Sequence, residues 1–261
     1  MSIENSTKIN HLLQNLPQGS VATSSWLFEQ GVNAQLVARY EKSQWLQSIG
    51  HGAYIRNGDR VAWQGGVYAI QSQLGIEVHV GGKTALELAG YGHFMPLSGN
   101  APYLYLFSGF KKKNLPPWFL NYDWKSTVIY KQPKLFIEND LALTTHTFPN
   151  FQIKISSPER AIIELLYLVP FEQGIDEACL ILEGMLTLRS DVIQNLLEKC
   201  TSFKVKRLFL ALSEEYLNPL FTELDISKIN LGKGKINLIS GGSFNKKFNI
   251  TLQKRPPIIN E

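Results

Sequence analysis

The apolar positions near the N-terminus repeat with the period of an α-helix and predict three short helices in succession. The first helix has one apolar stripe at offsets of 0, 3, 4 and 7, which consists of Ile9, Leu12, Leu13 and Leu16. Pro17 and Gly19 end that helix. Thr23 or Ser24 can cap a second helix, and Gly31 suits its end because glycine accepts a left-handed conformation.

Asn33 is suited to cap a third helix over roughly residues 34–44. The face expected to pack inward consists of Val32, Leu36, Val37 and Tyr40. The polar stripe on the opposite face consists of Gln35, Ala38, Arg39 and Lys42. Two helices joined by a short, glycine-bearing turn are typical of a helix-turn-helix motif.

Two short β-type runs follow, over residues 45–49 and 53–56, and they flank the tip Gly50-His51-Gly52. This pattern predicts a tight hairpin, so the N-terminal part is expected to be a winged helix-turn-helix. A helix over 61–74, a strand over 77–80 and a helix over 83–89 come next. The stretch 95–102, rich in Pro, Gly, Ser and Asn, suits a domain boundary.

The second half of the chain mixes strands and helices. Strands are predicted at 103–107, 127–130, 135–137 and 151–155, and β-like runs at 235–240 and 247–252 around Gly241-Gly242. Ser157-Pro158-Glu159 is a helix start, and further helices are expected near 173–186, 190–199 and 203–216. We therefore predict an α+β protein, with a winged helix-turn-helix and a helical extension in residues 1–95 and a mixed α/β domain in residues 96–261.

Composition excludes several classes of protein. The chain has 261 residues, of which 44% are hydrophobic and 18% charged, enough for two folded domains and too apolar for wholesale disorder. The two cysteines are too few for a disulfide framework, and no histidines lie at ligand spacing, so we expect neither metal nor cofactor. The N-terminus does not resemble a signal peptide, and Glu164 and Pro170 interrupt the longest apolar stretch, so we expect a cytoplasmic protein that does not interact with membranes.

The net charge of +4 is unevenly distributed. Residues 1–95 contain six cations and six anions, whereas residues 226–260 contain seven cations and no acid, and residues 111–134 contain six lysines and one acid. The candidates for a second basic surface are Lys111, Lys112, Lys113, Lys233, Lys235, Lys246 and Lys247. Such runs are ordinarily solvated faces. The C-terminal run, which is interleaved with aromatic residues, equally suits binding of nucleic acid or an acidic protein, or a hairpin whose charged edge discourages aggregation.

The third helix and the hairpin are the strongest functional candidates, because the major groove of DNA accepts an α-helix. Gln35 is placed to contact adenine and Arg39 to contact guanine. The phosphate-contact candidates are Lys42, Ser24 and Ser25, and the hairpin adds His51 and Arg56. A scaffold for protein contacts remains the alternative. A neutral domain gains little from counterion release, so we expect modest affinity or cooperative binding.

Other chemistry finds little support in the sequence. Gly81-Gly82-Lys83-Thr84 resembles part of a phosphate-binding loop, but Glu77 stands where that motif needs glycine, so a close strand-to-helix turn is the better interpretation. No nucleophile motif is present, and Cys179 is expected to be an inert core thiol. We therefore predict no catalytic residues and no enzyme, with an unrecognised site in residues 96–261 as a third hypothesis.

Several segments together resemble AbiEi-type antitoxins of type IV, abortive-infection toxin–antitoxin systems in bacteria. In the N-terminal part the similar segments are Gly19-Ser20-Val21-Ala22-Thr23-Ser24, Gly31-Val32, Gln35-Leu36-Val37 and Ile49-Gly50-His51-Gly52-Ala53-Tyr54. They continue with Trp63-Gln64-Gly65-Gly66, the run from Val78 to Gly90, and His93-Phe94. Ser156-Ser157-Pro158-Glu159-Arg160-Ala161 is similar to the start of a helix in the C-terminal antitoxin domain.

The resemblance implies a transcriptional autorepressor whose winged domain binds inverted repeats in its own promoter. It also implies that the C-terminal domain opposes a nucleotidyltransferase-like toxin without forming a stable complex with it. The hairpin tip departs from related wings, which often have a cation where this chain has His51. A histidine is mostly neutral at pH 7, so its grip on phosphate is weaker. The alternative function is a protein-interaction module that uses a winged-helix scaffold and a basic C-terminal domain, without specific DNA binding.

Overall fold

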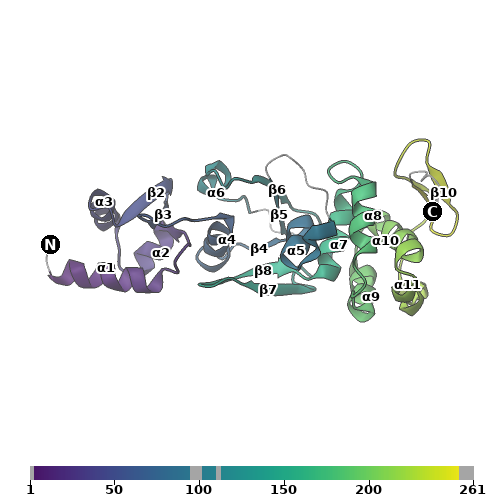
Figure 1. Cartoon of the computed structure of the whole chain (residues 1–261), viewed down its shortest axis with the longest axis horizontal. Helices are drawn as coiled ribbons and strands as arrows, with labels where there is room; N and C mark the ends of the chain where they lie inside the picture. Colours follow the sequence, from purple (N-terminus) through teal and green to yellow (C-terminus); the bar gives the residue numbers. More distant parts are fainter. Residues whose placement is uncertain (1–2, 95–101, 110–112, 253–261) are drawn as a thin grey trace. The chain divides into compact units, whose positions relative to one another are not determined.

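The computed structural model describes residues 3–94, 102–109 and 113–252 (Figure 1). The chain forms two compact units, and each consists of several chain segments. The first unit comprises Met1–Val80, Asn100–Gln132 and Thr144–Ile155. The second unit comprises Gly81–Gly99, Pro133–Leu143 and Ser156–Glu261. The two units are described in turn.

The first unit begins with the expected winged helix-turn-helix. Its elements are α1 (Ile3–Asn15), β1 (Ala22–Thr23), α2 (Ser24–Glu29), α3 (Ala34–Lys42), β2 (Leu46–Gly50) and β3 (Ala53–Arg56). The three strands form an antiparallel sheet in the order β1-β3-β2. One apolar cluster joins the helices to this sheet, and its buried members are Ile9, Leu12, Leu16, Ala22, Leu27, Val32, Leu36, Val37, Tyr40 and Leu46.

Local capping explains where these helices start and stop. Thr23, the first of the two expected caps, precedes α2, and its hydroxyl accepts a hydrogen bond from the Trp26 amide at 3.3 Å. The Asn33 side chain accepts one from the Leu36 amide at 3.0 Å at the start of α3. Gly31 adopts a φ of +77° between the two helices. The helix α3 ends at Lys42, slightly earlier than expected, and Gln44 then takes a positive φ of 58°.

A five-stranded mixed sheet completes the first unit. Its elements are α4 (Trp63–Ser72), β4 (Val78–Val80), β5 (Tyr103–Ser108), α6 (Pro117–Asn121), β6 (Thr127–Lys131), β7 (Leu143–Thr147) and β8 (Gln152–Ser156). The strand order is β6-β5-β4-β8-β7. The central strand β4 pairs antiparallel with β5 and parallel with β8. The N-terminal sequence therefore supplies the middle strand of a sheet whose other strands all follow residue 102.

Because of this pairing, the first compact unit contains residues from both sides of the domain boundary that we expected at residue 95. All three residues of β4 are buried, and the amides and carbonyls of a buried strand need partners on both sides. Those partners come from β5 and β8, beyond the expected boundary. Along the sequence, residue 95 thus falls between β4 and β5, which are neighbouring strands of one sheet. The division into residues 1–95 and 96–261 stays a prediction made from the sequence.

The second unit is mainly helical and packs around α7. Its helices are α5 (Gly82–Leu88), η1 (Tyr91–Phe94), α7 (Pro158–Leu168), α8 (Ile175–Glu183), α9 (Ser190–Lys199), α10 (Phe203–Tyr216), α11 (Asn218–Glu223) and η2 (Ile226–Lys228). Ser157 caps α7 by accepting from the Arg160 amide, and Pro158 occupies the first turn, as the sequence predicts. Most residues of α7 are buried, which makes this helix the centre of the core. The α+β fold class is confirmed.

The structure differs from the expected strands in two places. Residues 135–137 form no strand and contribute only an isolated antiparallel bridge between Phe136 and Cys200. The runs at 235–240 and 247–252 do not pair with each other as a hairpin. Instead β9 (Ile236–Asn237) lies parallel to β11 (Ile250–Leu252), and β10 (Ser243–Asn245) is the antiparallel partner of β11. No helix in the described part of the chain is long and apolar enough to cross a membrane.

Candidate nucleic-acid interface

The helix α3 presents its polar stripe to solvent and buries its apolar stripe. Leu36, Val37 and Tyr40 are buried in the helical core, while the exposed residues of the other face are Gln35, Ala38, Arg39 and Lys42. The Tyr40 hydroxyl is buried and has no hydrogen-bond partner among the described residues, and burial raises the pKa of Tyr40. The inward face thus fixes the rotation of α3, and the outward face is free to contact a ligand.

The first turn of α2 lies beside the tip of the hairpin. The Ser24 amide donates a hydrogen bond to the Gly52 carbonyl at 2.9 Å. The side chains of Ser24 and Ser25 are exposed, and the Ser25 hydroxyl lies 3.1 Å from the Thr23 hydroxyl. His51 is also exposed at the tip. The structure therefore joins the start of α2 to the hairpin, with two serine hydroxyls and one imidazole on the surface.

The hairpin rests on a segment that lies far from it in the sequence. At Gly50, where φ is +155°, a Cβ atom would lie 2.8 Å from the Cβ of Trp118 in α6. Only glycine permits this approach between β2 and α6. Sequence reasoning missed Trp118, because no local pattern indicates a contact with a strand so far away along the chain.

Arg56 does not belong to the exposed set. It is half-buried, and its guanidinium donates hydrogen bonds from Nη2 to the carbonyls of Leu13 and Leu16 at the end of α1. Helix C-termini leave carbonyls without partners, and a cation there is favourable. Arg56 therefore joins β3 to α1 inside the fold, and its contact with DNA stays a prediction.

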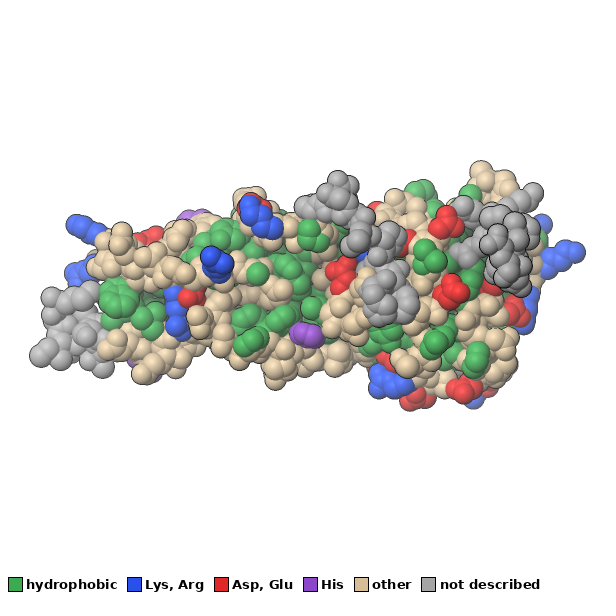
Figure 2. All heavy atoms as spheres, viewed as in Figure 1, with side chains coloured by type: hydrophobic (Ala, Val, Ile, Leu, Met, Phe, Trp, Pro, Cys, Tyr) green, Lys and Arg blue, Asp and Glu red, His purple; other side chains and the backbone are tan. Residues whose placement is uncertain are grey.

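The net charge of each compact unit differs from the net charge of the expected domains. The three segments of the first unit contain eleven cations and six anions, a net charge of +5, and those of the second unit contain fifteen cations and sixteen anions, a net charge of −1. The surplus thus belongs to the unit that holds the winged helix-turn-helix, although residues 1–95 alone are neutral. Figure 2 shows lysines and arginines at several separate places on the visible face.

The expected second basic surface is divided between the two units. Lys113 is exposed in the first unit, while Lys111 and Lys112 lie outside the described residues. The lysines of this set in the second unit are all exposed, namely Lys233, Lys235, Lys246 and Lys247.

Two of these lysines have partners within the second unit. Lys235 lies over the Phe244 ring, with Nζ 5.0 Å from the ring centroid. Lys247 forms an ion pair with Glu214 and lies over the Phe221 ring. Their charges are partly engaged inside the fold, so these two lysines are less available to a ligand than their exposure alone suggests.

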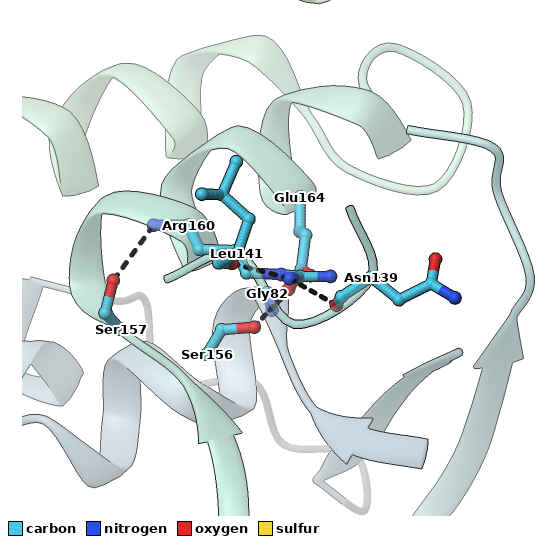
Figure 3. Close-up of polar contacts among 7 residues, drawn as sticks. All are labelled: Gly82, Asn139, Leu141, Ser156, Ser157, Arg160 and Glu164. Carbon is cyan, nitrogen blue, oxygen red and sulfur yellow. Dashed lines mark hydrogen bonds and ion pairs between the residues drawn. The ribbon is translucent and has the colours of Figure 1, made fainter. Parts of the chain in front are cut away.

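The Gly81-Gly82-Lys83-Thr84 turn binds carboxylates of the chain itself. The Gly82 amide donates to Glu164 Oε2 at 3.1 Å, and the same oxygen accepts from the Ser156 hydroxyl at 2.7 Å (Figure 3). Arg160 Nε donates to the other oxygen, Oε1, at 2.7 Å. Lys83 is paired with Glu177. The position that a phosphate occupies in a phosphate-binding loop is taken by Glu164, as suits a structural turn.

Comparisons with known proteins cover both parts of the chain. Residues 5–97 match the family model described as "Transcriptional regulator, AbiEi antitoxin N-terminal domain", and residues 101–253 match "Transcriptional regulator, AbiEi antitoxin, Type IV TA system". Among solved structures, the RV2827C protein from Mycobacterium tuberculosis has a similar fold, with a TM-score of 0.56 at 10% identity over 96% of this chain and 92% of that chain. No curated protein sequence matches the chain.

Proposed function

The chain belongs to the family of AbiEi antitoxins, transcriptional regulators of type IV toxin–antitoxin systems, and we propose that it represses its own operon through the winged helix-turn-helix. The observation that carries the proposal is the exposed polar stripe of α3, whose opposite face is fixed in the core. We further propose that the chain counters a nucleotidyltransferase-like toxin without a stable complex, and that it has no catalytic activity of its own.

Each exposed side chain has a contact for which its chemistry is suited. Gln35, near the start of α3, pairs with the two hydrogen-bonding groups of adenine in the major groove. Arg39, one turn later, pairs in the same way with guanine. Lys42 at the end of the helix and the hydroxyls of Ser24 and Ser25 contact phosphates, which set the register of the protein on DNA. His51 contacts the neighbouring backbone from the hairpin tip.

The net charge of the first unit supports this assignment. Its +5 gives the winged helix a favourable field for a polyanion, which residues 1–95 alone lack. The surplus is small for a DNA-binding unit, so the proposal includes binding to two inverted half-sites, where a second bound copy adds to the affinity.

A retardation assay with the DNA immediately upstream of the protein's own reading frame tests the proposal. Arg39→Ala is expected to lose about 5- to 150-fold in affinity, because a bidentate base contact is worth about 1–3 kcal/mol. Arg60→Ala, which also removes an exposed arginine from the first unit but lies off α3, is the matched control and should bind within about twofold of the parent. Equal binding by Arg39→Ala and the parent would contradict the assignment of α3.

Toxin antagonism is tested separately by sequencing the neighbouring reading frame and co-expressing the chain with the nucleotidyltransferase-like toxin that the proposal expects there. The full chain should restore growth, and Arg39→Ala should restore it equally when expressed from an unrelated promoter. The alternative, a protein-interaction module, predicts a stoichiometric partner in a pull-down together with no DNA retardation at low salt. Failure of growth rescue by the full chain would remove the antitoxin function.

A further inference from the structure

The side chain of Gln73, at the end of α4, takes the place of a neighbouring strand for β1. Its Oε1 accepts from the Thr23 amide at 2.8 Å, and its Nε2 donates to the Val21 carbonyl at 2.7 Å. Val21 and Thr23 are both buried, so water is a poor substitute partner for these groups. β3 pairs with the other side of β1, and the Gln73 amide thus completes the hydrogen bonding of this short strand.

The strand β1 determines where the DNA-binding elements start. Thr23 is the cap of α2, with its hydroxyl on the Trp26 amide. The next amide, that of Ser24, donates to Gly52 at the tip of the hairpin. Gln73 therefore holds Thr23, the cap of α2, which directly precedes Ser24, the residue that binds the hairpin tip.

A second glutamine of α4 makes the equivalent connection to the five-stranded sheet. Gln71 Nε2 donates to the carbonyls of Val78 and Lys154 at 2.8 and 3.0 Å, and the Lys154 amide donates to Gln71 Oε1 at 2.8 Å. The helix α4 thus lies between the winged sheet and the five-stranded sheet, with one amide on each (Figure 1).

Two glycines allow α4 to pack closely on the segment before β1 and on the Trp124 side chain. A Cβ atom at Gly65 would lie 2.0 Å from the Gly19 carbonyl oxygen. A Cβ atom at Gly66 would lie 2.7 Å from the Trp124 ring. Contacts this close leave α4 little freedom to shift, so it is a rigid support for the residue that holds β1.

We propose that Gln73 is a positioning residue for DNA binding, which fixes the angle between the α2–α3 pair and the rest of the first unit without touching DNA. The inference rests on the proposed function. Base contacts by Gln35 and Arg39 require α3 at one depth and angle in the groove, whereas phosphate contacts tolerate small rotations. Loss of the Gln73 amide therefore reduces specific binding more than general binding.

The test compares Gln73→Ala with Gln71→Ala, which removes the same kind of amide from the same helix. The probes are the duplex immediately upstream of the reading frame and an unrelated duplex of equal length. Gln73→Ala is expected to lower the ratio of specific to general affinity roughly tenfold, with an unchanged salt slope because no cation is removed. Gln71→Ala should keep the ratio within about twofold despite a comparable loss of thermal stability.

Two further measurements separate positioning from simple loss of folding. Amide exchange of Thr23 should accelerate in Gln73→Ala and stay at the parent rate in Gln71→Ala. Gln73→Glu keeps an acceptor for the Thr23 amide but places a carboxylate oxygen, which has no proton to donate, against the buried Val21 carbonyl, so it should not recover the specificity ratio. All affinities are measured where circular dichroism shows the variant folded, and Gln73→Glu replaces Gln73→Ala if the latter does not fold.

The outcomes distinguish the two hypotheses. If the parent does not retard the upstream duplex at low salt, the proposed function fails, whatever Gln73 does. If the parent binds and Gln73→Ala keeps both the specificity ratio and the Thr23 protection, the positioning role is overturned. Equal loss of specificity in Gln73→Ala and Gln71→Ala also overturns it, because Gln73 would then contribute only to general stability.

Discussion

Gly50 in the hairpin lies against Trp118 in α6, so closely that a Cβ atom at Gly50 would be 2.8 Å from the Trp118 Cβ. The hairpin of the winged helix is therefore supported by a residue that follows the expected domain boundary. The five-stranded sheet shows the same dependence, because β4 from the N-terminal sequence is its central strand. The winged helix-turn-helix, Asn100–Gln132 and Thr144–Ile155 thus belong to one compact unit.

Gly50→Ala is the direct test of this contact. The added methyl group forces β2 and α6 apart, and overpacking of this kind costs about 1–3 kcal/mol of the free energy of unfolding. Chemical denaturation measures the loss, and the upstream duplex should bind more weakly in the same variant. Gly174→Ala is the control, because a Cβ atom there meets nothing within 4 Å, and it should be neutral.

Separate expression of residues 1–95 and 96–261 tests the shared sheet. Residues 1–95 alone are expected to be insoluble or to unfold without a cooperative transition, because β4 loses β5 and β8. Co-expression of the two pieces should give a soluble complex that elutes as one species. A cooperative melting transition in isolated residues 1–95 would contradict the shared sheet, whereas one in residues 96–261 would not, because that piece contains most of the second unit.

The Glu159–Arg189 pair predicts a defined pH dependence. Burial alone would raise the pKa of Glu159, but hydrogen bonds from Arg189 and Ser157 outweigh it and lower the pKa from 4.5 to about 2. Because the folded-state pKa is the lower one, the stabilisation is complete above about pH 4.5 and disappears as the pH falls through 2. At 1.36 kcal/mol per pKa unit it amounts to at most about 3 kcal/mol.

Urea denaturation of Glu159→Gln against pH checks this expectation. The difference in unfolding free energy from the parent should be constant above pH 5 and should shrink toward pH 2. Glu138→Gln, which breaks the more exposed pair with Lys199, should cost less than about 1 kcal/mol at any pH. A cost of Glu159→Gln that does not change between pH 6 and pH 2.5 would refute the assignment.

The buried pair of Arg160 and Glu164 predicts strong non-additivity. Glu164→Leu leaves the Arg160 guanidinium, the Gly82 amide and the Ser156 hydroxyl without this carboxylate, and should cost about 3–5 kcal/mol. Arg160→Met with Glu164→Leu removes both charges and should cost less than the sum of the single changes. Thermal unfolding of the four proteins in this cycle measures the coupling, and simple additivity would show that the two charges do not depend on each other.

Lys42 provides a test of phosphate contact that does not depend on base recognition. Its removal in Lys42→Ala should lower the magnitude of the slope of log affinity against log salt by about one, for specific and unrelated duplexes alike. Lys8→Ala, which removes an exposed lysine of α1, should leave the slope unchanged. An unchanged slope in Lys42→Ala would mean that Lys42 neutralises no phosphate.

Local patterns were sufficient to predict the helices of the candidate interface and the start of α7. Thr23, Asn33 and Ser157 cap helices through hydrogen bonds that span three residues, and the two faces of α3 follow from the period of the helix. Interactions this short in sequence are encoded within a few neighbouring positions. The exposure of Gln35 and Arg39 could therefore be predicted before any tertiary contact was known.

The amino-acid sequence by itself determined the helix-turn-helix, its hairpin and the side chains that face outward. Only the tertiary structure decided that β4 pairs with β5 and β8, that Arg56 binds the end of α1, and that Gln73 completes β1. These partners lie tens of residues apart, and an arginine or glutamine has the same local pattern whether it faces solvent or a buried carbonyl. Whether the side chain faces solvent or a buried carbonyl depends on how the elements pack, because packing excludes the water that would otherwise take the same hydrogen bonds.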